Sequence, residues 1–390
     1  MKKYDFDKVI NRRSSDSAKW NPLSLKERFG YGELLPLWTA DMDFQAPEEV
    51  IEALRKRVEH GLYGYTIHSQ TMDEAIISWL KNRWDLDVSP ESMLFTSGAV
   101  MAITQLIQVF TEPGDSILIQ PPVYFPFRSS IELNNRQVIK SPLIISQDSV
   151  SIDFESLENV ISKHRPKMML LCNPHNPLSR VWKKGELEQL ASILNKYNVF
   201  LVSDEIHGDL TFNNHRHYSW GRVENAAKDG FAIIYSPSKT FSLAGLPFTT
   251  VIIPDREKRK MLGNYLMASR IGVDNVLTYA AVEAAYTHGA PWLNNVKKYI
   301  WDNYKYLVNE LEKRLPKAWV APLQGTYLAW INFEAYGIDE ELASRFINEA
   351  KLALVDGQWF GDEGLGSMRI NLACPRSVLE EAIDKMCKLF

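Results

Sequence analysis

The stretch Ser236-Pro-Ser238-Lys239-Thr-Phe241 decides how the rest of this chain is interpreted. It follows the apolar run Phe231–Tyr235, which is typical of a buried strand. A lysine just past a core strand, between hydroxyl-bearing residues, is poorly explained as a solvated surface charge. It is typical of an amine that forms a Schiff base with a carbonyl cofactor, while the neighbouring hydroxyl groups hold the cofactor's phosphate.

The length, net charge and cysteine content of the chain limit its domain number, its classes of partner and its location. A chain of 390 residues exceeds one ordinary core, so two domains are expected, one of them large. The net charge of -4 gives no reason to expect nucleic acid or an anionic membrane as a partner. We find no apolar run long enough to span a bilayer and no apolar signal region near Met1. Three scattered cysteines cannot form a disulfide framework, so a cytoplasmic location is expected.

Short apolar strands alternate with helices through the middle of the chain. Strands are expected at 93–96, 116–119, 167–171, 199–203, 231–235 and 248–253. Helices are expected at about 47–58, 71–84, 99–110 and 184–197. This alternation is typical of an α/β fold with a mostly parallel sheet between helices. Ligands bind at the carboxyl ends of the strands in such sheets.

The pattern changes after about residue 285. A long amphipathic helix is expected at about 292–315, followed by the apolar segment 327–333 and by helices at 339–351 and 376–389. These elements predict a smaller α+β domain, and the aromatic, loop-like N-terminal segment is expected to pack with it. The sequence therefore predicts an N-terminal segment at 1–45, a large domain at 46–285 and a small domain at 286–390.

Four features follow predicted strands at their carboxyl ends. Ser97-Gly-Ala99-Val100 opens a helix and can present backbone N–H groups to an anion. Asn176, in Cys172-Asn-Pro-His-Asn-Pro, can donate its amide to a phenolate oxygen. Asp204, in Val202-Ser-Asp-Glu-Ile-His207, can pair with a pyridine nitrogen. Lys239 is the fourth feature.

Each feature has an ordinary alternative. These are a connecting turn at Ser97, an Asn-Pro turn at Asn176, a helix N-cap at Asp204 and a solvated lysine at the start of a helix. The four features nevertheless occur in order on successive strand ends of one sheet. Together they favour an enzyme that binds pyridoxal phosphate (PLP).

The spacing of Asn176, Asp204 and Lys239 resembles that of PLP-dependent enzymes of the aspartate aminotransferase fold, also called fold type I or class I/II aminotransferases. Within that fold the chain is most similar to the PatB/MalY group of carbon–sulfur β-lyases, which includes the cystathionine β-lyases. The segments that carry this second resemblance are Trp38-Thr-Ala-Asp-Met-Asp-Phe44, Tyr63-Gly-Tyr65, Lys239-Thr-Phe-Ser-Leu-Ala-Gly-Leu246 and Arg369-Ile-Asn-Leu-Ala-Cys-Pro375.

The resemblance implies a role for each matching residue. The expected catalytic residues are Lys239, which carries the cofactor and then moves protons, Asp204, which pairs with the ring nitrogen, and Tyr124, which stacks on the ring. The other expected cofactor contacts are the backbone amides of Ala99 and Val100 and the side chains of Asn176, His207, Ser236 and Ser238. Tyr65 is expected to reach the phosphate of the neighbouring subunit, which implies a homodimer with shared active sites.

The substrate site implied by the resemblance includes Arg369, Trp38 and Asn176. Arg369 is expected to bind the α-carboxylate of an amino acid through two N–H donors, a geometry that favours arginine over lysine. The implied reaction is β-elimination on L-cystathionine or cysteine-type substrates, which yields pyruvate, ammonia and a thiol.

An aminotransferase that moves the amino group of an L-amino acid to a 2-oxo acid is the principal alternative. It uses the same residues up to loss of the α-proton. Many aminotransferases of this fold carry an arginine eight residues after the Schiff-base lysine, whereas this chain has Pro247. That departure weakens the alternative.

Two further classes remain open from sequence. A metallohydrolase could use His207, Asp209, His215 and His217, or the pair Asp41 and Asp43. The polar segment 213–217 is more typical of an exposed loop, so no metal is expected. A regulatory protein built on an enzyme scaffold is the other class, but the early tryptophans and tyrosines are better explained as core and dimer contacts.

Overall fold

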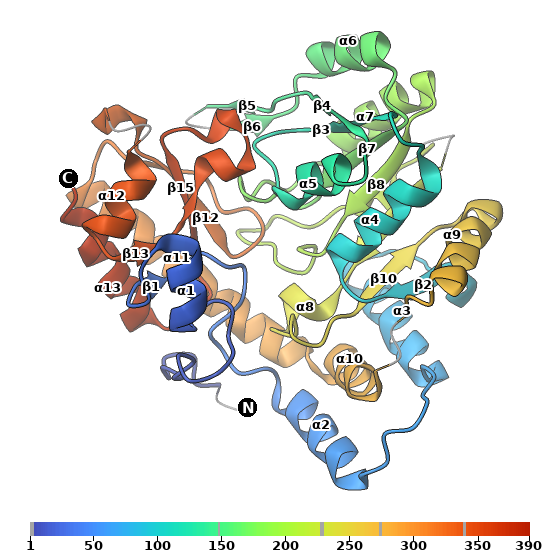
Figure 1. Cartoon of the computed structure of the whole chain (residues 1–390), viewed down its shortest axis with the longest axis horizontal. Coiled ribbons are helices and arrows are strands. Elements are labelled where there is room, and N and C mark those ends of the chain that lie inside the picture. Colours follow the sequence, from blue (N-terminus) through green and yellow to red (C-terminus); the bar gives the residue numbers. More distant parts are fainter. Residues whose placement is uncertain (1–3, 147–148, 227–229, 273–274, 338–340) are drawn as a thin grey trace.

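The computed structural model describes residues 4–146, 149–226, 230–272, 275–337 and 341–390. Its larger sheet has seven strands in the order β2-β10-β9-β8-β7-β3-β4 (Figure 1). The strands are β2 (Met93–Thr96), β3 (Ser116–Ile119), β4 (Gln137–Lys140), β7 (Met168–Cys172), β8 (Phe200–Asp204), β9 (Phe231–Tyr235) and β10 (Thr249–Ile252). β10 runs opposite to the other six strands of this sheet, which are parallel to one another, so the predicted mostly parallel sheet is confirmed.

Helices cover both faces of this sheet. Successive side chains of a strand point to opposite faces, and here they belong to two different apolar clusters. In β7, Met168 and Leu170 face a cluster with α4, α5 and α9, whereas Met169 and Leu171 face the main core. The helices on the first face are α4 (Ala99–Phe110), α5 (Pro126–Glu132) and α9 (Arg256–Ser269). Those contributing to the main core include α3 (Gln70–Trp84), α6 (Phe154–His164), α7 (Lys184–Tyr197) and α10 (Val276–His288). Continuous apolar strands are buried on both sides in this way.

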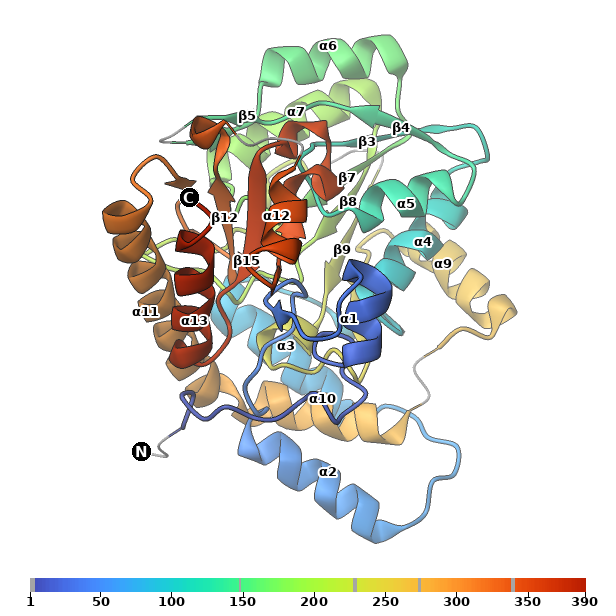
Figure 2. The ribbon, with the colours of Figure 1, turned by 60° about the vertical axis from the view of Figure 1, so that its left-hand side comes forward.

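The second sheet has four antiparallel strands in the order β11-β12-β15-β14. They are β11 (Trp319–Val320), β12 (Leu328–Asn332), β14 (Val355–Asp356) and β15 (Ser367–Asn371). Two helices, α11 (Ala290–Arg314) and α13 (Arg376–Cys387), lie side by side against it (Figure 2). The expected helix at 339–351 is observed as α12 (Leu342–Asn348), and residues 339–340 lie outside the described residues.

The N-terminal segment contains structure that sequence reasoning missed. The helix α1 (Pro22–Phe29) starts with Asn21, whose side chain accepts from the Leu23 N–H, and ends at Gly30 with φ 83. The short strand β1 (Leu35–Pro36) pairs in parallel with β13 (Leu352–Ala353), and the two form a separate two-stranded sheet that joins the N-terminal segment to the C-terminal part of the chain. This pairing supports the expected packing of residues 1–45 on the small domain. The domain boundaries at 45 and 285 stay predictions.

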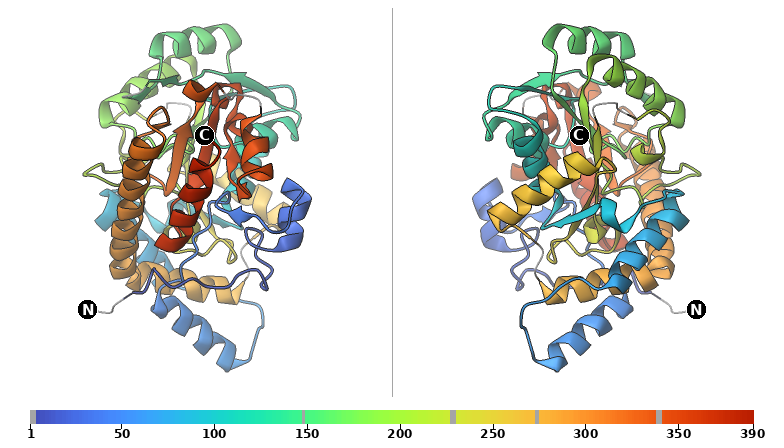
Figure 3. Two further views of the ribbon diagram at one scale, coloured as in Figure 1. Left: turned by 90° about the vertical axis from the view of Figure 1, so that its left-hand side faces the viewer. Right: turned by 90° about the vertical axis from the view of Figure 1, so that its right-hand side faces the viewer.

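The remaining elements connect these layers. They are α2 (Glu48–His60), β5 (Ile144–Ile145), β6 (Val150–Ser151), α8 (Pro237–Thr240) and the 3-10 helices Pro90–Ser92, Trp220–Arg222, Glu334–Tyr336, Gly357–Phe360 and Asp362–Gly364. Helix α2 packs on α10 at the end of the molecule away from α6 (Figure 3). No helix in the described part of the chain is both long and apolar enough to cross a membrane.

Candidate active site

Three predicted side chains meet where the central strands of the large sheet end. Asn176 follows β7, Asp204 ends β8 and Lys239 follows β9, and parallel neighbours bring these ends to one edge. Arg369 reaches the same place from β15 of the second sheet. The cavity between them has a volume of ≈ 110 Å³. Its lining also includes Trp38, Thr39, Ala40, Tyr124, Phe125, Cys172, Ile206, His207, Val355 and Trp359.

Lys239 lies in α8, a helix of only four residues that starts at a side-chain cap. The Ser236 hydroxyl accepts from the Ser238 N–H at 3.2 Å and donates to the Phe248 carbonyl at 2.6 Å. The Lys239 Nζ donates to the Ala40 carbonyl at 2.8 Å. Burial lowers the pKa of Lys239 to about 8, although the nearby Asp41 charge acts in the opposite direction. Neutral amine is therefore available near neutral pH.

Asp204 is a buried carboxylate in the lining of the cavity. It is 3% exposed, and its Oδ1 accepts from the Ile206 N–H at 3.3 Å. Burial raises the pKa of Asp204 to about 7, against the lowering effects of that hydrogen bond and of the Lys239 charge. A cationic N–H donor placed next to this group would favour its charged form.

Arg369 presents a buried guanidinium at the opposite wall. Its two terminal nitrogens donate to Asn176 Oδ1 at 3.0 Å and to the Trp38 carbonyl at 2.7 Å. Within the described residues its Nε has no hydrogen-bond partner, and the two acceptors of its terminal nitrogens are neutral. Burial lowers the pKa of Arg369 to about 10, so the group stays cationic at neutral pH. The site therefore offers a positive charge to an incoming anion.

Tyr124 and His207 complete the polar lining. Burial, followed by the Asp204 charge, raises the pKa of Tyr124 to about 12, so its hydroxyl is protonated. The His207 Nδ1 is buried and has no partner among the described residues. Burial lowers the pKa of His207 well below its ordinary value, which favours the neutral imidazole. Both groups are available to a bound ligand.

The residues predicted to hold a phosphate lie outside the cavity lining. Helix α4 begins after Gly98, whose φ of 108 is a conformation suited to glycine, and no side chain caps the helix. The first N–H groups of the helix, including those of Ala99 and Val100, therefore receive no side-chain cap from Gly98, and such a helix N-terminus is a common place for an anion. The Ser236 and Ser238 hydroxyls lie 2.9 Å apart.

Tyr65 is not brought to the site within one chain. Its side chain is fully exposed, in the segment that connects α2 to α3. The role expected for Tyr65 needs a second subunit. Its contact with a phosphate stays a prediction.

Several cavity residues were missed from sequence. The Ala40 carbonyl accepts from both Lys239 Nζ and, at 2.9 Å, the Tyr327 hydroxyl. Phe125 could have been found as the neighbour of Tyr124, and Ala40 as part of the Trp38 motif. Trp359 comes from the 3-10 helix Gly357–Phe360, and no sequence signal marks it.

Several of the side chains considered for a metal site have other partners. Asp41 and Asp43 bind Arg12, and Asp43 also binds the buried Lys19 at 2.6 Å. The His217 Nε2 lies 2.8 Å from a carboxylate oxygen of Glu205. In the ranges that the structure describes, no group of three or more His, Cys, Asp or Glu side chains could hold a metal ion.

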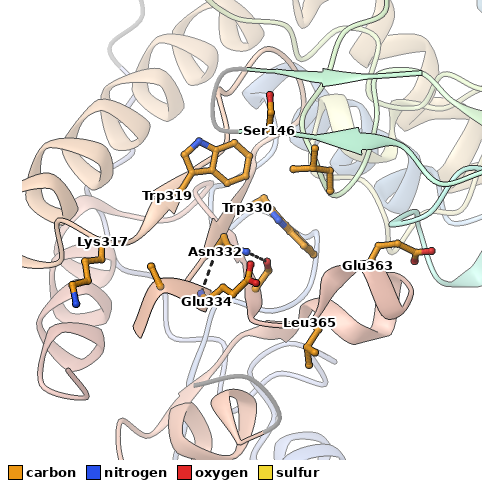
Figure 4. A pocket seen from close by; sticks show the side chains of 11 residues that line it. Ser146, Lys317, Trp319, Trp330, Asn332, Glu334, Glu363 and Leu365 are labelled. Atoms are coloured by element: carbon orange, nitrogen blue, oxygen red, sulfur yellow. Dashed lines mark hydrogen bonds between the residues drawn. The ribbon is translucent and has the colours of Figure 1, made fainter. Parts of the chain in front are cut away.

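A larger cavity of ≈ 670 Å³ lies between the β5 end and the second sheet (Figure 4). Its walls include Trp319, Trp330 and Asn332, whose amide donates to the Ser367 hydroxyl at 3.1 Å. None of the predicted site residues lines it. The smaller cavity, where Lys239 and Arg369 meet, is therefore the candidate active site.

Comparison with known proteins agrees with this geometry. The model of the family "Aminotransferase class I and II" matches residues 33–386. The chain belongs to this family. This aminotransferase-family chain is 39% identical, over 98% of each sequence, to the cystathionine beta-lyase PatB of Bacillus subtilis (strain 168). The resemblance predicted from the motifs is confirmed.

Two solved structures share the fold over nearly the whole chain. A PLP-bound protein from Clostridium difficile 630, whose name assigns it to the aminotransferases only provisionally, has a TM-score of 0.96 and 38% identity, covering 99% of this chain and 100% of its own. The PLP-bound C-S lyase from Staphylococcus hominis has a TM-score of 0.94 and 33% identity, covering 99% and 98%. The predicted fold class is thus confirmed.

The buried polar groups of the site fit the cofactor bound by these neighbours. The buried Asp204 carboxylate suits a protonated ring nitrogen, and the free His207 Nδ1 lies on the same cavity wall. The uncapped start of α4 suits a phosphate. The Lys239 amine suits an aldehyde carbon. The donor set of this aminotransferase-family site therefore fits PLP.

Proposed function

We propose that this chain catalyses PLP-dependent β-elimination on sulfur amino acids, with L-cystathionine or cysteine-type substrates giving pyruvate, ammonia and a thiol. The observation that carries the proposal is one cavity that is lined by the Lys239 amine, the Arg369 guanidinium and the buried Asp204 carboxylate. The names of PatB and of the Staphylococcus hominis C-S lyase support elimination at a carbon–sulfur bond.

Arg369 and Lys239 have separate roles in the proposed reaction. PLP, when bound, supplies an electron-withdrawing ring that stabilises negative charge at the substrate α-carbon. Arg369 binds the α-carboxylate through its N–H donors and so fixes the orientation of the Cα–H bond. The Lys239 Nζ accepts the α-proton. Its lowered pKa leaves enough neutral amine for this step near neutral pH.

Other residues hold the ring and limit access of water. Asp204 keeps the ring nitrogen protonated by placing a negative charge against it. Tyr124 would pack against the ring face, and Asn176 and His207 would bind the edge that carries the phenolic oxygen. Large apolar side chains, among them Phe125 and Trp359, wall the cavity. Exclusion of water strengthens each electrostatic contact inside it.

Product analysis tests the proposed reaction directly. Purified protein with PLP and L-cystathionine, without a 2-oxo acid, is expected to release pyruvate, ammonia and homocysteine over many turnovers. An aminotransferase lacks an acceptor under these conditions and stops after one turnover, with the amino group left on the cofactor. Absence of pyruvate from L-cystathionine and from S-substituted cysteines alike, with amino transfer on adding a 2-oxo acid, would contradict the proposal.

We also propose that the protein acts as a cytoplasmic homodimer whose active sites are shared. The connection from α2 to α3 carries exposed apolar side chains, including those of Leu62, Tyr65 and Ile67. An exposed apolar segment of this kind is typical of an interface. The same connection lies away from both sheets (Figures 1 and 2). Tyr65 of one subunit then reaches the phosphate end of its partner's cofactor.

Mixing two defective variants tests this shared site. Homodimers of Lys239→Ala and of Tyr65→Ala are each expected to be strongly impaired, because every site lacks one group. Dissociation and reassembly of an equal mixture is expected to restore about a quarter of native activity, since half of the dimers carry one complete site. Additive residual activity in the mixture, with subunit exchange confirmed by mass, would contradict a shared site.

A further inference from the structure

A second buried carboxylate lies behind the candidate active site and outside its lining. Asp209 follows β8 by five residues, on the turn that begins just after Asp204, and it is 4% exposed. Gly208 allows this turn to pack closely, because a Cβ there would lie 2.3 Å from the Trp84 ring. The turn therefore delivers the Asp209 carboxylate to a fixed place in the core.

Four side chains from three elements donate to this carboxylate. Its Oδ1 accepts from the indole nitrogens of Trp79 at 3.1 Å and Trp84 at 3.0 Å, both on α3. Its Oδ2 accepts from the hydroxyls of Tyr235 at 3.1 Å and Thr240 at 2.9 Å. The pKa of Tyr235 is raised well above its ordinary value by burial and then by the Asp209 charge, so its hydroxyl remains a donor.

Two of these donors bracket the lysine segment. Tyr235 ends β9, and Thr240 directly follows Lys239. Helix α8 has only four residues, which is too short to be stable through its own hydrogen bonds. Its geometry depends on contacts at its two ends, which are the Ser236 cap at the start and the Thr240 bond to Asp209 at the end.

We propose that Asp209 is a positioning residue, which fixes the Lys239 amine relative to Asp204 by tying the end of β9 and the end of α8 to the turn after β8. Asp209 reaches neither cofactor nor substrate and acts through Thr240 and Tyr235. The amine that must accept the α-proton is thereby held at a set distance from the ring that Asp204 orients. This inference rests on the proposed function.

Removing a single donor tests the inference with little loss of packing. Thr240→Val keeps the shape of the side chain and deletes the O–H donor. It is expected to lower kcat about tenfold or more while leaving KM within about twofold, because a small displacement of a reacting group is costly and substrate binding depends on Arg369. Thr240→Ser retains the hydroxyl and is expected to restore kcat to within about threefold of native.

A matched control separates positioning from general destabilisation. Thr250 lies on β10 beside Tyr235, is fully buried, and its hydroxyl has no partner among the described residues. Thr250→Val makes the same chemical change and is expected to leave kcat unchanged. Thermal unfolding of each cofactor-free variant measures folding separately. If Thr240→Val does not fold, Tyr235→Phe removes the other hydroxyl donor to the same oxygen and is expected to lower kcat in the same way.

A spectroscopic measurement does not depend on turnover. The midpoint of the pH titration of the holoenzyme's visible absorption reports the surroundings of the Lys239 nitrogen. It is expected to move by about 0.5 unit or more in Thr240→Val and to stay at the native value in Thr240→Ser and Thr250→Val. A native midpoint and native kcat in Thr240→Val would overturn the positioning role.

Failure of the proposed function gives a different result. Borohydride reduction of the native holoenzyme, followed by peptide mass analysis, is expected to find the cofactor attached to Lys239. If no adduct forms at Lys239 in the native protein, the proposed function itself fails. If the adduct forms and Thr240→Val behaves as native, the proposed function stands and only the role of Asp209 is rejected.

Discussion

Replacement of Lys239 by alanine is expected to reduce β-elimination at least about 10³-fold, because the variant lacks both the amine that binds the cofactor covalently and the base that accepts the α-proton. Pyruvate release from L-cystathionine measures the loss. The fold is expected to persist, since the Ala40 carbonyl keeps its hydrogen bond from the Tyr327 hydroxyl when the lysine is removed. Circular dichroism and thermal unfolding of the cofactor-free protein check this second expectation.

Lys239→Arg is the matched control for charge and size. Arginine retains a positive charge and N–H donors for the Ala40 carbonyl, but its guanidinium stays protonated and cannot accept a proton at neutral pH. Its activity is expected to fall as far as that of the alanine variant. Retention of more than about a tenth of native turnover by either variant would remove Lys239 from the proton-transfer role.

The part of the fold predicted best from sequence consists of long or strongly apolar elements. The bounds of β2, β3, β9, α4 and α7 agree with those expected, because each has a clear apolar run or an apolar face of helical period. The strands β7 and β8 are shifted by one residue toward the C-terminus. In both, the last residue carries part of the site, Cys172 in β7 and Asp204 in β8.

Elements held by distant partners could not be predicted. The two-residue strand β1 exists because it pairs with β13, more than 300 residues away. Its sequence, Leu35-Pro36, is too short to show the alternation of apolar and polar residues that marks a strand.

Helix α1 was missed for another reason. Its sequence has start and stop signals in Asn21-Pro22 and Gly30, but the helix is only eight residues long and buries one side chain, Leu25.

Some residues of the candidate site could be predicted from the sequence itself, and others could not. Asn176, Asp204 and Lys239 could be brought together from sequence, because they follow neighbouring parallel strands whose ends share one edge. Arg369 and Trp38 entered only through resemblance to a family. Trp359 had neither signal, since the 3-10 helix Gly357–Phe360 places it and no motif marks that segment.

Asp204→Asn is expected to lower kcat by about 10² to 10³, because a preorganised charge is replaced by a neutral amide of nearly the same size. Burial raises the pKa of Asp204 to about 7, which is close to neutral pH. A single cationic partner is therefore enough to keep this carboxylate ionised. A protonated ring nitrogen is such a partner. The neutral amide of asparagine has no negative charge with which to keep that ring nitrogen protonated. Steady-state kinetics with L-cystathionine, at saturating PLP, measure the effect.

Glu205→Gln provides a comparison at the next position of the chain. Glu205 is also buried, but it accepts from the Ser203 hydroxyl at 2.8 Å and from the Trp220 N–H at 2.8 Å and does not line the cavity. Its loss is expected to lower the unfolding temperature and to leave kcat within about fivefold of native, because the network that it supports is structural. Equal losses of kcat in the two variants would mean that any buried charge change at the end of β8 disturbs the site, and the pairing of Asp204 with the ring would lose its support. A large loss confined to Asp204→Asn requires that the carboxylate itself acts on the cofactor.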